Sequence, residues 1–235
     1  MVKIKWKSIG QRILEWLLSV WKGFVGGLKH LPYAFYIQVH PFDGFFRLKN
    51  EQSRRSIPCA VILYAMLAIS SILKRQLTGY LFADTAAQLQ LNILSEIIAA
   101  LLPYMLWVVA NWCFTSLMDG DGKLSDIFCA TAVATIPIMV CNLIQIPVSQ
   151  FSSLQEENLY VFIGGLGIVY TYLMMFFGMM ITHQYTVFKS IITTLLTIVG
   201  MLVIAFIIIL IFFLIQQVLG FATSLGSEIS FRLNE

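Results

Sequence analysis

Residues 201–215 read MLVIAFIIILIFFLI, a run of fifteen positions with no charged and no hydrogen-bonding side chain. The chain around it is also apolar: its 235 residues are 59% hydrophobic and 11% charged. Soluble domains are roughly 45–50% apolar and about 25% charged, so one soluble core could not cover this much apolar surface. The sequence therefore predicts an integral membrane protein, with lipid as the solvent for much of its surface.

Five segments are long enough to cross a bilayer, which takes about 20 mostly apolar residues. They cover about residues 57–73, 93–118, 127–151, 159–181 and 191–221. Pro137 and Pro147 should bend the third segment, because proline removes a helical hydrogen bond. The fifth is so long that it either tilts or extends beyond the bilayer. The predicted fold class is all-α, a polytopic membrane protein with five transmembrane helices and an N-terminal amphipathic interfacial helix.

The distribution of lysine and arginine predicts the orientation of the chain. Ten of the fifteen lie before residue 56, and Lys123 and Lys189 bring one side of the membrane to twelve. The other side has three: Lys74, Arg75 and Arg232. Because cytoplasmic loops are rich in these residues, we expect a multi-pass protein of the cell membrane with a cytoplasmic N-terminus and an extracytoplasmic C-terminus. The basic N-terminal quarter favours an anionic membrane face, and not nucleic acid, as its partner.

Three regions follow from this pattern. Residues 1–34 are predicted to form an amphipathic basic helix in the membrane interface, with Ile13, Trp16 and Val20 on its apolar stripe. The same stripe could instead pack on a partner subunit. Residues 35–220 form the five-helix transmembrane domain, and residues 221–235 are expected to be a short outer tail.

The stretch MDGDGKLSD, residues 118–126, is the most polar part of the membranous region. It lacks the ligand positions of an EF-hand calcium loop and the pattern of a phosphate-binding loop. A tight turn between the second and third spans explains it, with positive φ at the glycines and Ser125 or Asp126 capping the next helix. A partner could also dock there, and the candidate docking residues are Asp119, Gly120, Asp121, Gly122 and Asp126.

Charge is nearly absent inside the predicted spans, where Glu96 lies close to an outer end. The neutral polar residues of the second and third spans are predicted to be packing devices: Asn111, Thr131, Thr135 and Asn142. We expect Asn111 to hydrogen-bond to one of the two threonines across the helical hairpin, a contact worth about 0.6 kcal/mol. Asn142 should satisfy the carbonyl of Ala99, which loses its helical donor to Pro103.

No pattern typical of an enzyme is present. The four cysteines lie in apolar runs without metal-ligand spacing. The three histidines belong to no catalytic motif, and His183 is expected to lie in the interface at the end of the fourth span, favoured by the helix dipole. We therefore expect a protein that is not an enzyme and that needs no cofactor and no metal.

Two stretches carry a family resemblance: HPFDGFFRLKNE at residues 40–51 and WVVANWCFTSLMDGDGKLSDIFCATAVATIPIMV at residues 107–140. With five predicted spans, the chain resembles the Yip-domain family, and its bacterial branch in particular, over about residues 35–220. The resemblance implies a non-enzymatic accessory or scaffold subunit of a larger membrane complex. One such complex is a bacterial carbohydrate ABC importer, whose permease subunits would be the partners. The alternative is a transporter or permease in its own right.

The first of these stretches also predicts how the chain enters the membrane. The histidine–proline pair at 40–41 should break the local structure, and Asp43 with Gly44 should form a turn. The three phenylalanines would lie among the lipid headgroups and the basic residues at the membrane surface. The stretch is thus expected to be a membrane anchor, or alternatively a docking motif in which Asp43 and Phe45 meet a partner.

Overall fold

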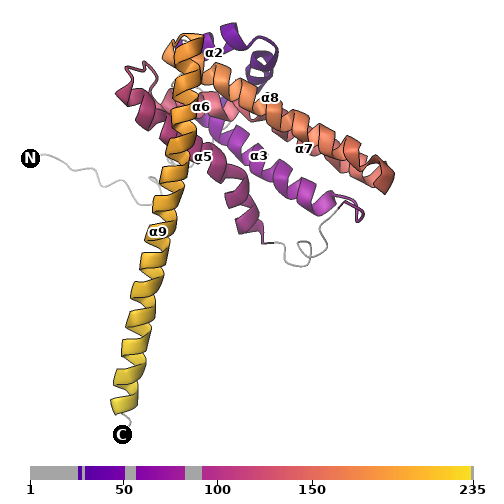
Figure 1. Ribbon diagram of the computed structural model, residues 1–235. Helices are drawn as coiled ribbons and strands as arrows, with labels where there is room; N and C mark the ends of the chain where they lie inside the picture. Colours follow the sequence, from indigo (N-terminus) through magenta and orange to yellow (C-terminus); the bar gives the residue numbers. More distant parts are fainter. Residues whose placement is uncertain (1–25, 28–29, 51–56, 83–91, 234–235) are drawn as a thin grey trace, which may run out of the picture.

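The computed structural model describes residues 26–27, 30–50, 57–82 and 92–233 (Figure 1). The predicted interfacial helix over residues 1–34 lies outside these ranges except for its last positions. Within the described part of the chain no residue is in a strand. Five helical segments there are long and apolar enough to cross a membrane, which confirms the predicted fold class.

Four of these segments form a bundle in which one helix, α3 (Ile57–Leu77), lies in the middle. On one side of α3 is α5 (Ile93–Leu117), and on the other are α7 (Ile136–Phe151) and α8 (Glu157–His183) (Figure 1). The short α6 (Leu124–Ala134) connects α5 to α7, and a 3-10 turn η1 (Leu154–Glu156) precedes α8. The predicted third span is thus made of α6 and α7 together.

The two ends of the bundle have different loops. The DGDG end is where α5 turns into α6 at residues 119–122 and α8 turns into α9 at residues 184–186. The Arg75 end holds the connections that follow α3 and α7. At this end the amide of Gly79 donates to the hydroxyl of Ser149 at 2.9 Å, so α3 and α7 end at the same level.

The third span is broken between α6 and α7, as Pro137 predicts. Because Pro137 has no amide hydrogen, the carbonyl of Val133 loses its helical donor. The side-chain amide of Gln38 donates to this carbonyl at 2.9 Å. The backbone amide of Ile138 donates to the hydroxyl of Thr171 at 3.2 Å. Side chains from two other elements therefore satisfy the backbone groups that the break exposes.

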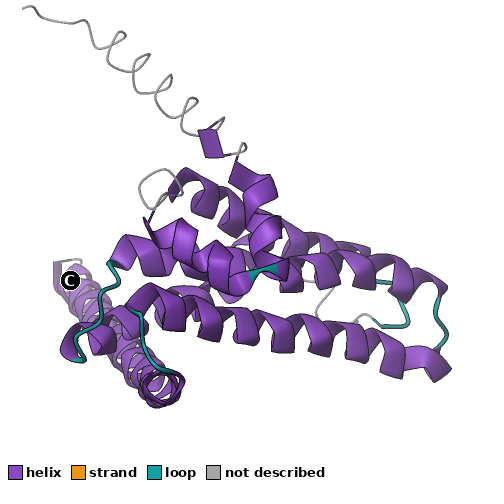
Figure 2. Cartoon of the chain, turned by 90° about the horizontal axis from the view of Figure 1, so that it is seen from above, coloured by secondary structure: helices purple, strands orange, loops and turns teal. Residues whose placement is uncertain are grey.

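Residues 30–50 form a helical hairpin, called the N-terminal hairpin below (Figure 2). Residues 30–39 are helical, the chain reverses at residue 40, and α2 (Pro41–Asn50) begins with a proline, which suits a first helical position. The predicted break is confirmed, but the predicted turn at Asp43 and Gly44 is wrong, because both lie in the first turns of α2. Gly44 instead permits close packing: a Cβ there would lie 2.7 Å from the side chain of Ile37.

The apex of the N-terminal hairpin reaches the middle of the bundle. Tyr170, at the centre of α8, donates from its hydroxyl to the carbonyl of Gln38 at 2.6 Å. Farther along, the ring of Phe42 lies 5.2 Å from the ring of Phe177. Thus α2 runs beside the second half of α8, and the apex lies about 20 Å from the DGDG end at 1.5 Å per residue. A bilayer has about 30 Å of hydrocarbon, so we expect the apex to lie inside the membrane when the bundle stands upright.

The last helix, α9 (Val187–Leu233), has 47 residues and extends far beyond the bundle (Figure 1). Its first turns pack on α5 through small polar residues, with Ser190, Thr193 and Thr197 all 0% exposed. Every residue from 206 to 228 is exposed. The helix continues through residues 221–233, so the predicted start of the outer tail at residue 221 does not coincide with a helix end.

Candidate functional site

MDGDGKLSD forms the predicted tight connection between α5 and α6, but its glycines do not have the predicted positive φ. The residue in the left-handed region is Asp119, with a φ of 54°, a conformation that a short polar side chain tolerates. The amide of Gly120 donates back to the carbonyl of Thr115 at 2.8 Å. The glycines are required by packing, since a Cβ at Gly120 or at Gly122 would lie 2.6 Å from the ring of His183.

His183 connects three parts of the DGDG end. Its side chain is 2% exposed, so it is buried and not interfacial as the sequence predicted. The amide of Gly122 donates to Nδ1 at 3.3 Å, so Nδ1 is an acceptor and the proton of the neutral ring is on Nε2. Nε2 then donates to Oδ1 of Asn111 at 3.2 Å. One neutral ring thereby joins α5, the α5–α6 connection and α8.

The same connection is held by Tyr185, which lies between α8 and α9, and by Lys189 in the first turn of α9. The Tyr185 hydroxyl and the Lys189 ammonium both donate to the carbonyl of Met118, at 3.1 Å and 2.8 Å. The ammonium also lies 4.2 Å from the centroid of the Tyr185 ring, within the range of a cation–π contact. Burial raises the pKa of the Tyr185 phenol, and the carboxylates of Asp119 and Asp121 raise it further. The phenol therefore stays a hydrogen-bond donor at neutral pH.

The acidic residues of this stretch have two different roles. Asp119 and Asp121 are exposed, and together they are called the acidic loop surface below. Asp126 is only 7% exposed, and its Oδ2 accepts from the amide of Lys123 at 3.1 Å. This contact satisfies an amide at the start of α6, so the predicted capping role of Asp126 is confirmed. Its predicted docking role is wrong, because its carboxylate faces its own helix.

The polar residues predicted to pack between the spans are all buried: Asn111, Thr131, Thr135 and Asn142. The predicted bond between Asn111 and a threonine is wrong, since Asn111 pairs with His183. The hydroxyls of Thr131 and Thr135 donate to carbonyls of their own helix at 2.8 Å. Matching depth in the membrane does not fix the partner, because each threonine hydroxyl is already engaged by a carbonyl of its own helix.

Asn142 also has a partner other than the predicted one. Its Oδ1 accepts from the ammonium of Lys74 at 3.4 Å. The predicted contact with the carbonyl of Ala99 is wrong, because α7 packs on α3 and α8 while α5 lies on the other side of α3. Asn142 therefore joins α7 to α3 near the Arg75 end.

Phe45, a predicted docking residue, is not available to a partner. Its side chain is 1% exposed and its ring lies against Gly178 of α8, where an added Cβ would be 3.3 Å away. The prediction is wrong because the stretch is helical. The helix places Gly44, Phe45 and Leu48 on the buried face of α2.

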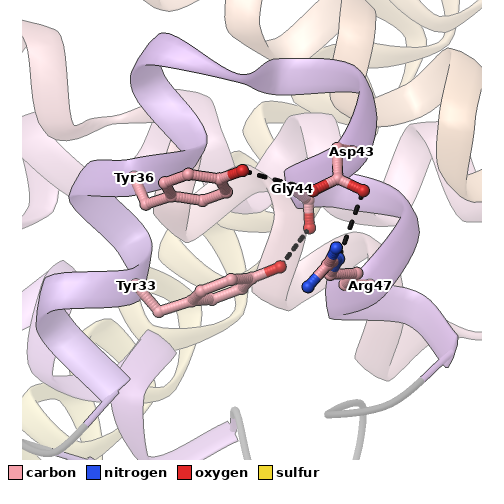
Figure 3. Close-up of polar contacts among 5 residues, drawn as sticks. All are labelled: Tyr33, Tyr36, Asp43, Gly44 and Arg47. Carbon is pink, nitrogen blue, oxygen red and sulfur yellow. Dashed lines mark hydrogen bonds and ion pairs between the residues drawn. The ribbon is translucent and has the colours of Figure 1, made fainter.

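Asp43, the other candidate on α2, connects the two helices of the N-terminal hairpin (Figure 3). Its carboxylate accepts from the Tyr36 hydroxyl at 3.3 Å and from Nε of Arg47 at 3.2 Å. The Tyr33 hydroxyl donates to the carbonyl of Gly44 at 3.0 Å. The Asp43 side chain remains 46% exposed, so it lies at the surface while its oxygens hold the hairpin.

Comparison with known families gives one result. The profile of the Yip1 domain matches residues 35–209, well over half of the chain. The chain belongs to the Yip1 domain family. Neither the curated proteins nor the solved structures contain a significant match.

The Yip1 domain contains nearly everything described above. The matched residues begin inside the N-terminal hairpin and end within α9, so they include α2, the DGDG end and the broken third span. The first half of α9, which packs on α5, also belongs to the Yip1 domain. The exposed residues 210–228 of α9 lie outside the match.

Sequence reasoning missed three residues that organise the Yip1 domain: Gln38, Tyr185 and Lys189. For Lys189 a signal was present, because it is the basic residue between the last two spans and falls on the same predicted side as the acidic stretch. For Gln38 the signal was weaker. Pro137 required some donor for the carbonyl of Val133, but nothing in the sequence pointed to a side chain 95 residues away.

Proposed function

We propose that this Yip1 domain protein is a non-catalytic accessory or scaffold subunit that binds other integral membrane proteins through the acidic loop surface. The observation that supports it is a pair of exposed carboxylates on a fixed backbone. Asp119 and Asp121 are exposed on a connection held by His183, Tyr185 and Lys189. A surface that is already ordered loses little entropy on binding, and two carboxylates suit a partner that presents lysine or arginine.

A non-catalytic role agrees with the chemistry of the same site. Both ring nitrogens of His183 are engaged, one by a backbone amide and one by an asparagine. His183 is thus a positioning residue of the acidic loop surface.

We further propose that the protein is bacterial and lies in the cell membrane, with its N-terminus and the acidic loop surface in the cytoplasm. The support for the orientation is the unequal distribution of lysine and arginine between the two sides. A carbohydrate ABC importer, with its permease subunits as partners, is the specific complex we suggest. Its support is the resemblance to the bacterial branch of the family.

The test is co-purification after extraction in a mild detergent, with quantitative mass spectrometry of the retained proteins. We expect the wild-type chain to retain a stoichiometric membrane-protein partner. The double variant Asp119→Asn/Asp121→Asn should lose that partner without a change in thermal stability. The matched control, Glu156→Gln/Glu157→Gln, removes two carboxylates at the Arg75 end and should keep it. A wild-type chain that is recovered alone, or a partner retained equally by both variants, would overturn the proposal.

The alternative, a transporter in its own right, is favoured by one observation, a cavity of about 260 Å³ between the helices. It requires solute flux in liposomes that contain the purified protein alone. Flux that Ile168→Trp, a substitution in the cavity wall, abolishes would favour the transporter over the scaffold.

A further inference from the structure

The cavity of about 260 Å³ lies between α3, α5, α7 and α8, in the half of the bundle toward the Arg75 end. Its wall is mostly apolar, and no residue that lines it is charged. Ser71, Ala100 and Ile138 contribute to it from three different helices. Tyr172 lines it from α8 and is 60% exposed, so the cavity is continuous with the outer surface of the bundle between α5 and α8. In a membrane, that surface is covered by lipid chains.

Four polar side chains form a collar one helical turn from this wall, on the side of the Arg75 end: Lys74, Arg75, Glu96 and Asn142. Lys74 and Arg75 follow the wall residue Ser71 by three and four positions in α3. Glu96 precedes Ala100 by four positions in α5. One turn of an α-helix is about 5.4 Å, so the apolar cavity changes to a polar collar over about that distance.

The collar has a net positive charge. Arg75 and Glu96 form an ion pair at 2.7 Å, which cancels their charges. Lys74 is half-buried, and its ammonium contacts the amide oxygen of Asn142 at 3.4 Å and lies 5.8 Å from the ring of Tyr160. None of the described carboxylates lies within ion-pair distance of Lys74. With two basic residues and one acidic residue, the collar keeps one net positive charge, and Lys74 has no ion-pair partner among the described residues.

We propose that this cavity binds one acyl chain of an anionic phospholipid, whose phosphate lies at Lys74. An apolar cavity of this size does not hold water well and takes apolar ligands. Basic pockets between transmembrane helices recognise anionic headgroups. The apolar wall suits the acyl chain of a phospholipid, and the positive collar one turn away suits its negative headgroup. The site is independent of the acidic loop surface at the opposite end.

The headgroup is tested by native mass spectrometry of the full-length protein in micelles that contain dioleoylphosphatidylglycerol or dioleoylphosphatidylcholine. One phosphatidylglycerol should be retained more tightly than phosphatidylcholine. Lys74→Gln should weaken phosphatidylglycerol binding about fivefold, the effect of one lysine near an anionic lipid, and leave phosphatidylcholine unchanged. Lys123→Gln removes the same charge from an exposed position at the DGDG end and should change neither. Equal retention of the two lipids, or equal effects of the two substitutions, would overturn the proposal.

The acyl chain is tested by filling the cavity. Ala100→Phe should lower the retention of both lipids, whereas Ile98→Phe, on the exposed face of the same helix, should lower neither. If Ala100→Phe does not fold, Ile168→Trp fills the cavity from α8 and replaces it in the comparison. Retention that is unchanged when the cavity is filled would overturn the acyl-chain site.

Discussion

Thr171 and Thr197 are both buried threonines on membrane helices, but their hydroxyls have different partners. The Thr171 hydroxyl accepts from the amide of Ile138 at the break in the third span. The Thr197 hydroxyl donates to the carbonyl of Thr193 in its own helix at 2.8 Å. Thr171→Val should cost about 1–3 kcal/mol, because a buried amide loses its acceptor. Thr197→Val should be nearly neutral, since such bonds within a helix add little. Thermal unfolding in detergent measures both, and equal losses would contradict this role of Thr171.

Gly122 and Gly220 offer a second matched pair. A Cβ at Gly122 would lie 2.6 Å from Cε1 of His183, whereas nothing lies within 4 Å of a Cβ at Gly220. Gly122→Ala should therefore destabilise the protein by about 1–3 kcal/mol through overpacking. Gly220→Ala should be neutral or stabilising, because alanine is a better helix former. The expected result is a lower unfolding temperature and faster proteolysis at the acidic loop surface for Gly122→Ala alone. Similar behaviour of both variants would exclude a packing role for Gly122.

Residue pairing was the part of the site that the sequence could not provide. Asn111 and His183 are 72 residues apart, and each was recognised separately as a polar residue of a span. Depth along the helix predicts a threonine of the third span as the partner of Asn111. Depth follows from residue number and the helical rise, but the rotation of each helix about its axis depends on side-chain packing between helices. Asp119 and Asp121 are exposed, and their predicted role in docking stays a prediction.

At the scale of elements, the spans were predictable and the N-terminal hairpin was not. Bilayer thickness requires about 20 apolar residues per span, so the start of α5 at Ile93 and the end of α7 at Phe151 followed directly. The helix α2 has only ten residues and includes Asp43, Arg47 and Lys49, so no rule for spans applies to it. The spacing of its small and apolar residues is typical of a helix, whereas aspartate followed by glycine is typical of a turn. The structure follows the first pattern.

The depth of the N-terminal hairpin is testable with cysteines in a background from which the four native cysteines have been removed. Val39 is 74% exposed at the apex, and Asn50 is exposed at the end of α2. In liposomes, Val39→Cys should resist a charged thiol reagent, because about 20 Å of bundle separates it from the DGDG end. Asn50→Cys should react. In detergent with the membrane removed, the rate at Val39→Cys should rise. Equal reaction of both positions in liposomes would mean that the hairpin lies outside the hydrocarbon.

At the scale of the whole molecule, the apolar length of α9 is consistent with its direction relative to the bundle. The apolar part of α9, residues 191–221, is about 46 Å long at 1.5 Å per residue. The hydrocarbon of a bilayer is about 30 Å thick, so this segment fits entirely inside only when tilted by about 50° from the membrane normal. Figure 1 shows α9 leaving the bundle at a steep angle to α3, α7 and α8. A bundle that stands upright in the membrane would therefore give α9 the slant that its apolar length requires.

This geometry predicts how many positions of α9 lie in hydrocarbon. Single cysteines placed along residues 187–228 of the cysteine-free chain in liposomes should show about 30 consecutive positions protected from a charged thiol reagent. An upright helix would protect about 20, because the remaining residues would extend into water. Lipids with shorter acyl chains should reduce the protected stretch of an upright helix, whereas a tilted helix compensates by tilting further. A protected stretch of about 20 positions that shortens with the lipid would show that α9 stands upright and that its C-terminal half projects from the membrane.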